Sequence, residues 1–363
     1  MEKPPSVSWL VWSLLAAALS LSAYAQSSAD STAPKKFGII PVPFVAYAPE
    51  TRWAGGVFAG VVYRFTGVER PSASSFSAMY SERKQFDVKA DPSVYVGSWH
   101  FTHESEWQKW PDSFWGIGAH TADDAEESLT ARVFRTETGV NKELWPQVWA
   151  GMHYQYESVK LLEFEPGGWF DTMKQRDARI SGRTSGAGAG LGYDTRDNVF
   201  FPSRGVNCDA GATWFDPLLG SQFTYTEYFF NLRQYLPLHG SHVLAFQGFG
   251  RFVDGLPNFR GYSSFGADDK LRGYSGNRYK DKHAIFAQAE YRFPIWWRFR
   301  GALFSGAGDV ASDISAFAPR KFKHVIGGGL RVIVIRSEKL SLRLDLGYGA
   351  GSDGFYLSVN EAF

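Results

Sequence analysis

Residues 271–274 read Leu-Arg-Gly-Tyr, and this tetrapeptide closes a long polar loop just ahead of an alternating segment that opens at His283. The same Arg-Gly-Tyr sequence occurs earlier in the loop, beginning at Arg260. The later copy is the stronger candidate for a functional motif, because an aliphatic residue precedes it and the next strand follows within ten residues. A surface turn with an exposed arginine is the plain alternative. The strands around the loop decide between these readings.

The segments that follow the loop alternate between apolar and polar residues. In residues 283–294 and 338–349, aliphatic and aromatic side chains fall on one face of an extended chain, and polar side chains fall on the other. A strand with this period can place one face in lipid and the other in a wet lumen. Such regular charges argue against a dry sandwich core. The charged residues predicted to face the lumen are Glu290, Arg292, Arg343 and Asp345.

Short alternating segments separated by turn residues continue from Phe37 to the end of the chain, with almost no helical periodicity. Weak alternation repeated many times is typical of a membrane β-barrel. The sequence therefore predicts an all-β fold over residues 37–363, a transmembrane antiparallel β-barrel of about sixteen strands. The predicted strands are 37–48, 54–65, 73–82, 85–92, 94–106, 127–142, 147–160, 177–194, 204–215, 221–236, 242–253, 283–294, 299–310, 322–336, 338–349 and 354–363.

The lengths of the connections support this prediction, because outer-membrane barrels alternate short periplasmic turns with longer extracellular loops. Short connections are predicted at 237–241, 294–298 and 335–339, and longer ones at 254–282 and 309–321. This alternation places the loop that carries Arg272 on the extracellular side. It places both termini in the periplasm.

Residues 1–25 have the features of a secretory signal peptide, namely a lysine, an apolar run from Trp9 to Leu21 and small residues before Gln26. The apolar run is shorter than the about 20 residues that a membrane-spanning helix needs. Residues 26–36 are polar and rich in Ser and Ala. We expect them to form a short disordered lead-in to the barrel.

Composition favours a barrel and excludes some functions. Aromatic residues make up 17% of the chain and there are 38 glycines, a mixture that suits aromatic girdles and tight turns, although a secreted β-sandwich could share it. The net charge is +1 and the sequence has no basic stripe, so no nucleic-acid partner is expected. The single Cys208 excludes an intramolecular disulfide, and alternation points it toward lipid.

A second motif precedes the last half of the strand pattern. Residues 190–198 read Gly-Leu-Gly-Tyr-Asp-Thr-Arg-Asp-Asn, and residues 201–205 read Phe-Pro-Ser-Arg-Gly. A glycine-rich strand, a charged turn and a Pro-x-Arg-Gly opening, followed by the Arg272 tetrapeptide, resemble the bacterial surface-antigen superfamily of outer-membrane barrels. That superfamily includes barrel-assembly, translocation-assembly and two-partner-secretion transporters. The recognisable motifs lie in residues 186–363, and the first half matches only as generic strands.

The resemblance implies that the long extracellular loop folds back into the lumen and that Arg272, followed by Gly273 and Tyr274, pairs with carboxylates on the barrel wall. Glu290 is the first candidate partner and Asp345 the second, with Arg292 and Arg343 as lumenal neighbours. Members of the family usually carry a further Asp in a Phe-x-Asp-x-Gly pattern. Here Gly306 occupies that position. Without this Asp, Arg272 would depend more on Glu290 and Asp345 for its ion pairs, or the loop would be held less tightly.

The resemblance also marks the turn between 194 and 205 as periplasmic and structural. Asp194 with Arg196, or Asp197 with Arg204, would cross-link it. The motif residues of this turn are Asp194, Arg196, Asp197, Pro202, Arg204 and Gly205.

Phe363 ends an amphipathic final segment in which Phe355, Leu357 and Val359 precede it at two-residue steps, interrupted by Glu361. A terminal aromatic of this kind resembles the signal that the bacterial barrel-assembly machinery reads. That machinery is therefore an expected partner during biogenesis.

Two functions remain open from the sequence. The first is assistance to the insertion or translocation of proteins, or of lipids, at the outer membrane, where lipid would surround the barrel. Transporters of the superfamily usually carry polypeptide-transport-associated domains, and residues 26–36 are too few for one, so this function would require a separate periplasmic partner that supplies docking domains. The second is a structural or passive-pore barrel with a plugged lumen. An enzyme is the least favoured class, because neither a nucleophile motif nor metal-ligand spacing appears, and no cofactor or metal is expected.

Overall fold

The computed structural model describes residues 37–48, 52–68, 70–176, 180–336 and 339–363. The expected signal peptide (1–25) and lead-in (26–36) lie outside the described residues.

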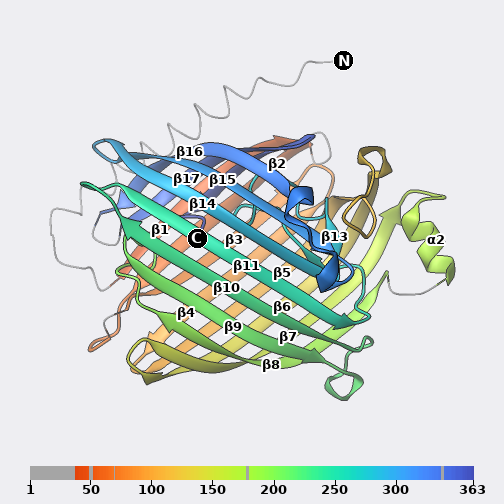
Figure 1. Cartoon of the computed structure of the whole chain (residues 1–363), viewed down its shortest axis with the longest axis horizontal. Coiled ribbons are helices and arrows are strands. Elements are labelled where there is room, and N and C mark those ends of the chain that lie inside the picture. The colour runs from red at the N-terminus through yellow and green to blue at the C-terminus, as the bar shows by residue number, and fades with distance from the viewer. Residues whose placement is uncertain (1–36, 49–51, 69, 177–179, 337–338) are drawn as a thin grey trace.

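Sixteen strands form one sheet in which each strand pairs antiparallel with the next along the chain. Figure 1 shows this sheet curling into a barrel. The strands of the sheet are β1 Phe37–Ala48, β2 Arg52–Tyr63, β3 Ser72–Ser81, β4 Phe86–Val96, β5 Trp99–Phe114, β6 Glu127–Trp145, β7 Val148–Phe164, β8 Gly182–Asp194, β9 Gly205–Phe215, β10 Tyr225–Pro237, β11 Val243–Gly255, β14 His283–Trp296, β15 Phe299–Ala311, β16 Lys323–Ile335, β17 Leu340–Gly349 and β18 Ser352–Val359.

The predicted fold class and the strand number are confirmed, while several strand boundaries were wrong. The break predicted near residue 93 lies at Gly97, so β4 and β5 run on to Val96 and Phe114. Gly97 has φ of +57°, which suits a tight hairpin turn. The segment from 177 was predicted as strand, but β8 begins at Gly182. The strand predicted from 221 begins at Tyr225 as β10, after a 3₁₀ turn at Pro217–Leu219.

Within the residues that the structure describes, helical structure is confined to the connections. One helix that the sequence did not predict, α2 at Trp169–Arg176, follows β7, and Glu127 accepts hydrogen bonds from the first backbone N–H groups of α2 at Trp169 (2.7 Å) and Phe170 (3.4 Å). Among the described residues, no helix is long and apolar enough to cross a membrane. The remaining 3₁₀ turns are Asp123–Ala125, Ile314–Ala316 and Pro319–Lys321.

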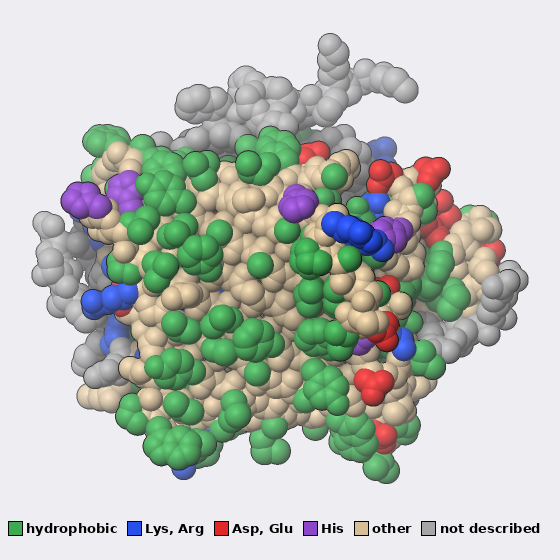
Figure 2. All heavy atoms as spheres, in the orientation of Figure 1, with side chains coloured by type: hydrophobic (Ala, Val, Ile, Leu, Met, Phe, Trp, Pro, Cys, Tyr) green, Lys and Arg blue, Asp and Glu red, His purple; other side chains and the backbone are tan. Residues whose placement is uncertain are grey.

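The outer wall is apolar and the lumen is polar. Leu303, Ile326 and Leu346 are exposed on successive strands, whereas Glu290 and Asp345 point inward and are completely buried. Figure 2 shows hydrophobic side chains spread over the outer wall, with most charged side chains gathered toward its two ends. This distribution is the reverse of a soluble globular protein and matches a wall that contacts lipid.

The two ends of the barrel differ. One end, the turn end, carries the short connections at 97–98, 146–147, 297–298 and 336–339, together with the start of β1 and the end of β18. The other end, the loop end, carries α2 and the long connection 256–282, as Figure 1 shows. Because the number of strands is even, the first strand begins and the last strand ends at the same end of the barrel, the turn end.

The first and last strands both contribute side chains to one hydrophobic cluster. Within the described residues, β1 and β18 share no backbone pairing, so the sheet has two free edges. A hydrophobic cluster nevertheless joins the two sides, packing Val42 of β1 and Val62 of β2 with Leu340 of β17 and Val359 of β18. Pro41 in β1 cannot donate a ladder hydrogen bond, and proline in a sheet is typical of an edge strand.

The end of the chain does not continue as a strand. The sequence predicted strand through Phe363, but β18 ends at Val359, and Asn360 takes a left-handed φ of +68°. This conformation turns the following residues into the lumen, where Glu361, Ala362 and Phe363 are buried. The strict alternation that placed Phe363 on the outer face is therefore broken by one residue. We call residues 360–363 the tail.

Candidate functional site: a lid locked into the lumen

The connection between β11 and β14, residues 256–282, folds into the barrel, and we call it the lid. It contains two short strands, β12 (Ser263–Ser264) and β13 (Lys280–Asp281), which pair antiparallel with each other. Its apolar side chains pack on the wall strands β14, β15 and β16. The buried residues that the lid contributes to this packing are Phe265, Leu271, Tyr274 and Tyr279.

Arg272 lies at the centre of the lid and has no solvent exposure. Its Nη2 donates to Glu290 at 2.5 Å, and its Nη1 donates to Asp345. Its guanidinium also lies 3.6 Å from the centre of the Phe304 ring, at cation–π distance. The structure thus brings Arg272 together with both carboxylates that the sequence nominated.

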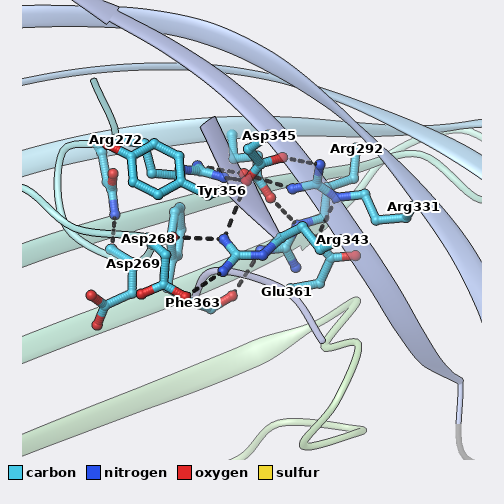
Figure 3. A network of polar contacts seen from close by, with 12 residues as sticks. Asp268, Asp269, Arg272, Arg292, Arg331, Arg343, Asp345, Tyr356, Glu361 and Phe363 are labelled. Carbon is cyan, nitrogen blue, oxygen red and sulfur yellow. Dashed lines mark hydrogen bonds and ion pairs between the residues drawn. The ribbon is translucent and has the colours of Figure 1, made fainter. Parts of the chain in front are cut away.

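Three more arginines complete a network around these carboxylates (Figure 3). Arg331 of β16 contacts Asp345 at 2.5 Å and Glu290 at 3.3 Å. Arg292 contacts Glu290 at 2.7 Å. Arg343 contacts Asp345 at 3.2 Å and Asp268 of the lid at 3.1 Å.

The tail belongs to the same network. Glu361 accepts from Arg331 at 2.9 Å and lies 3.6 Å from Arg292, while Arg292 donates to the backbone oxygen of Phe363 at 2.7 Å. The Phe363 ring packs against Phe201 and other apolar residues at the turn end. Arg292 and Arg331 therefore contact two groups at once. They bind the wall carboxylates that pair with the lid, and they bind the tail that follows β18.

Gly273 and Tyr274 fix the backbone of the lid against β17. Gly273 has φ of +128°, and a Cβ there would lie 2.9 Å from the backbone nitrogen of Tyr348, so only glycine fits. The Gly273 N–H donates to the Tyr356 hydroxyl at 2.9 Å. The Tyr274 hydroxyl donates to the His324 backbone oxygen at 3.2 Å and accepts from the Ala350 N–H at 3.0 Å.

Leu271 explains the glycine at position 306. A Cβ on Gly306 would lie 2.6 Å from Leu271 Cδ2 and 2.8 Å from the Gln288 Cβ. The aliphatic side chain of the lid therefore fills the space that a carboxylate would take, and Asp345 with Glu290 carries the pairing instead.

We expect Gly306→Ala to loosen the lid, because overpacking a well-filled site costs about 1–3 kcal/mol. The matched control is Gly248→Ala on β11, where a Cβ would meet nothing within 4 Å. Proteolysis of the purified barrel within residues 256–282 measures lid release. Equal cleavage of the two variants would mean that Leu271 does not seat the lid.

The lid is also anchored to the opposite wall. Arg260, which the sequence ranked as the lesser copy of the motif, is half-buried and contacts Glu157 of β7 at 3.0 Å. Arg278 reaches the loop after β5, donating to the Thr121 backbone oxygen at 3.0 Å and to Asp123 at 2.5 Å. Lys280 is buried in the lid and donates to Asn277 at 2.9 Å. Burial, aided by the nearby charge of Arg260, lowers the pKa of Lys280 to about 7.

The turn motif at 194–205 forms a second cross-linked unit at the turn end. Arg196 donates to Asp194 at 2.9 and 3.0 Å, and Arg70, which the sequence did not nominate, donates to the same carboxylate at 2.5 Å. Burial lowers the pKa of Arg196, but its hydrogen bonds to Asp194 outweigh this effect and raise it overall.

The contacts of Asp197 differ from the predicted ion pair with Arg204. Asp197 accepts from the backbone N–H groups of Ser203 (2.8 Å) and Arg204 (3.2 Å). Gly205 has φ of +105°, and a Cβ there would lie 2.3 Å from the Thr195 backbone oxygen. Pro202 offers its backbone oxygen to Arg292 at 3.4 Å, which links this turn to the lid network.

Space remains in the lumen beside the lid. A cavity of about 500 Å³ lies under the lid, and one of about 390 Å³ lies nearer the turn end, with Glu137 and Phe229 lining both. Both are lined by charged and polar side chains. The lid therefore narrows the lumen and leaves two polar cavities beside it.

The fold and this site define a class, that of membrane β-barrels whose lumen holds an inward-folded loop locked by an arginine–carboxylate network. Residues 69–363 match the model of the Omp85 superfamily domain. The chain belongs to the Omp85 superfamily, whose members are outer-membrane barrels.

Solved structures agree with the family. BamA from Haemophilus ducreyi lacking POTRA domains 1–3 is 13% identical with a TM-score of 0.56, covering 90% of this chain and 70% of that one. CdiB from Escherichia coli is 11% identical with a TM-score of 0.58, covering 90% of this chain and 62% of that one. CdiB from Acinetobacter baumannii is 10% identical with a TM-score of 0.52, covering 87% and 56%. This chain thus spans less than two thirds of either CdiB. A comparison with curated proteins gave no match.

Proposed function

We propose that this barrel assists the insertion or translocation of polypeptides at the outer membrane. The observation that carries the proposal is the lack of pairing between β1 and β18 within the described residues, combined with a tail that leaves the β18 edge and is tied to Arg292 and Arg331 of the wall. An unpaired edge offers backbone donors and acceptors to an incoming strand. The tail, which follows β18, turns into the lumen, so residues 360–363 do not extend the β18 edge.

A photo-crosslinking amino acid at Leu357 on β18 tests this proposal. Leu357 is exposed on the outer face beside the free edge, and Leu191 on β8 is an equally apolar, exposed control within the continuous sheet. We expect polypeptide adducts at Leu357 and none above background at Leu191. Adducts at neither position, in cells that are actively exporting outer-membrane proteins, would favour a passive barrel.

We propose that both termini and the turn end face the periplasm, and that a periplasmic partner docks there. A cavity of about 730 Å³ opens between the turns at this end, lined by Arg70, Trp149 and Arg196 among others. Four separate hairpin turns contribute to it, so it offers a partner a structured surface. Recovery of a docking-domain protein from mild detergent extracts would support this role.

The orientation makes a prediction of its own. In a Cys208→Ser background, Ser315→Cys at the loop end should react with a membrane-impermeant maleimide on intact cells, because that loop is exposed. His239→Cys at the turn end should react only after the outer membrane is permeabilised. The opposite labelling pattern would show that the turn end, and not the loop end, faces the outside of the cell.

A further inference from the structure

Two arginines surround one tryptophan at the turn end. Trp297 and Arg298 form the turn between β14 and β15, and Arg336 begins the turn between β16 and β17. The guanidinium carbon of Arg298 lies 5.1 Å from the centre of the Trp297 ring, and that of Arg336 lies 5.9 Å from it. Since β15 pairs directly with β16, the two hairpins are neighbours in the sheet, and this contact joins their turns.

These arginines have no acidic partner within the described part of the chain. Neither forms an ion pair with an Asp or Glu there, unlike Arg70 and Arg196 at the same end of the barrel. Arg298 is only 5% exposed. Its Nη1 donates to the backbone oxygens of Ile333 and Val334 at 3.2 Å each, while its Nε has no acceptor.

A buried guanidinium without a counterion is costly, and a second positive charge nearby adds to that cost. Burial and, to a lesser extent, the charge of Arg336 lower the pKa of Arg298. An anion from outside the chain would relieve this repulsion. Arg336 is exposed and free to contact it.

The position of the pair indicates the kind of anion. Ile295, Trp296 and Trp297 are all exposed on the outer side of the turn. Tryptophans gather where the hydrocarbon core meets the lipid headgroups, so cations stacked on Trp297 lie at headgroup level. A planar guanidinium matches the oxygens of a phosphate group in two places.

We propose that Arg336 and Arg298, assembled around Trp297, bind the phosphate of an anionic phospholipid headgroup in the leaflet at the turn end. Arg336 contacts the phosphate, and Arg298, held by its two carbonyl contacts, supplies fixed positive charge behind it. This site goes beyond the proposed function, because it requires neither a client polypeptide nor a docking partner.

Native mass spectrometry of the whole purified barrel in detergent tests the site, with phosphatidylglycerol and phosphatidylcholine as separate probes. We expect the wild type to bind phosphatidylglycerol preferentially, and Arg336→Gln to weaken that binding about fivefold, the effect of one basic residue at a membrane surface. The matched control is Arg320→Gln, which removes an exposed arginine from the 3₁₀ turn at the loop end. Arg298→Gln should weaken binding as well.

Heat-modifiable migration on gels shows whether each variant is folded, and Arg336→Gln, being a surface change, should pass. Equal losses in Arg336→Gln and Arg320→Gln would overturn the site, because binding would then follow total charge. Equal binding of the two lipids by the wild type would also overturn it. Inorganic phosphate that displaces all bound phosphatidylglycerol would assign the site to a free ion instead of a lipid. Binding of an acidic peptide with no lipid preference would make the surface a protein contact.

Discussion

Arg272→Ala is expected to destabilise the closed lid by about 3 kcal/mol, the lower end of the cost of breaking a buried ion pair. The side chain fills the space between Glu290 and Asp345, and all three side chains are completely buried. Its loss leaves the two carboxylates sharing the other arginines. The lower end of the range applies because Arg331 still contacts both carboxylates. Protease cleavage within residues 256–282 on intact cells measures lid release.

Arg260→Ala is the matched control for this prediction. It also removes a lid arginine from a carboxylate, Glu157, but that pair is partly solvated and should contribute about 1 kcal/mol or less. Among the carboxylates, Glu290→Gln and Asp345→Asn should have similar effects, because each carboxylate contacts Arg272 and two further arginines. Equal cleavage of the two arginine variants would show that the network on β14–β17 does not hold the lid.

Phe363→Ala is expected to cost the assembled barrel about 3 kcal/mol, since truncating a buried Phe typically costs 3–5 kcal/mol and this one lies near the mouth of the lumen. The ring is 5% exposed and packs with Phe201, Tyr235 and Val243. Its backbone also accepts from Arg292. Denaturant unfolding of protein refolded into detergent or vesicles measures this loss without any assembly machinery.

Phe355→Ala serves as the control, because Phe355 lies on the same strand but is exposed on the outer wall. In cells, deleting Phe363 is expected to reduce outer-membrane assembly while export to the periplasm continues. The two assays separate two roles of the residue. If refolded Phe363→Ala were as stable as the wild type but assembled poorly in cells, Phe363 would act only as a recognition signal for assembly and would not stabilise the barrel.

Alternation along the strands was sufficient to predict the fold and part of the site. It placed Glu290, Arg292, Arg343 and Asp345 on the lumenal face, and these side chains do meet there. Arg331 sits on the same face of β16 and follows the same rule, so it could have been nominated from parity. The glycine run that precedes it obscured the apolar pattern that marks the opposite face.

Other contacts could not be predicted from any local pattern in the sequence. Glu361 was assigned to the outer face because the strand was extended to Phe363, whereas a single left-handed residue, Asn360, reverses its direction. The Arg70–Asp194 contact joins residues 124 positions apart, and nothing near Arg70 marks it. Helix α2 was missed because one short helix in a loop carries little periodicity, and its first N–H groups are instead held by hydrogen bonds that they donate to Glu127.

Burial of the tail changes which residues a receptor can reach before and after the barrel is complete. While the last strand is unfolded, its aromatic end is accessible to any receptor that recognises such an end. Once Phe363 enters the lumen and Glu361 joins Arg331, the same residues are enclosed by the wall of the product. A receptor that reads this end therefore binds unfinished chains and loses its ligand when folding finishes. Release then requires no separate source of energy, and a finished barrel does not compete with new chains for the receptor.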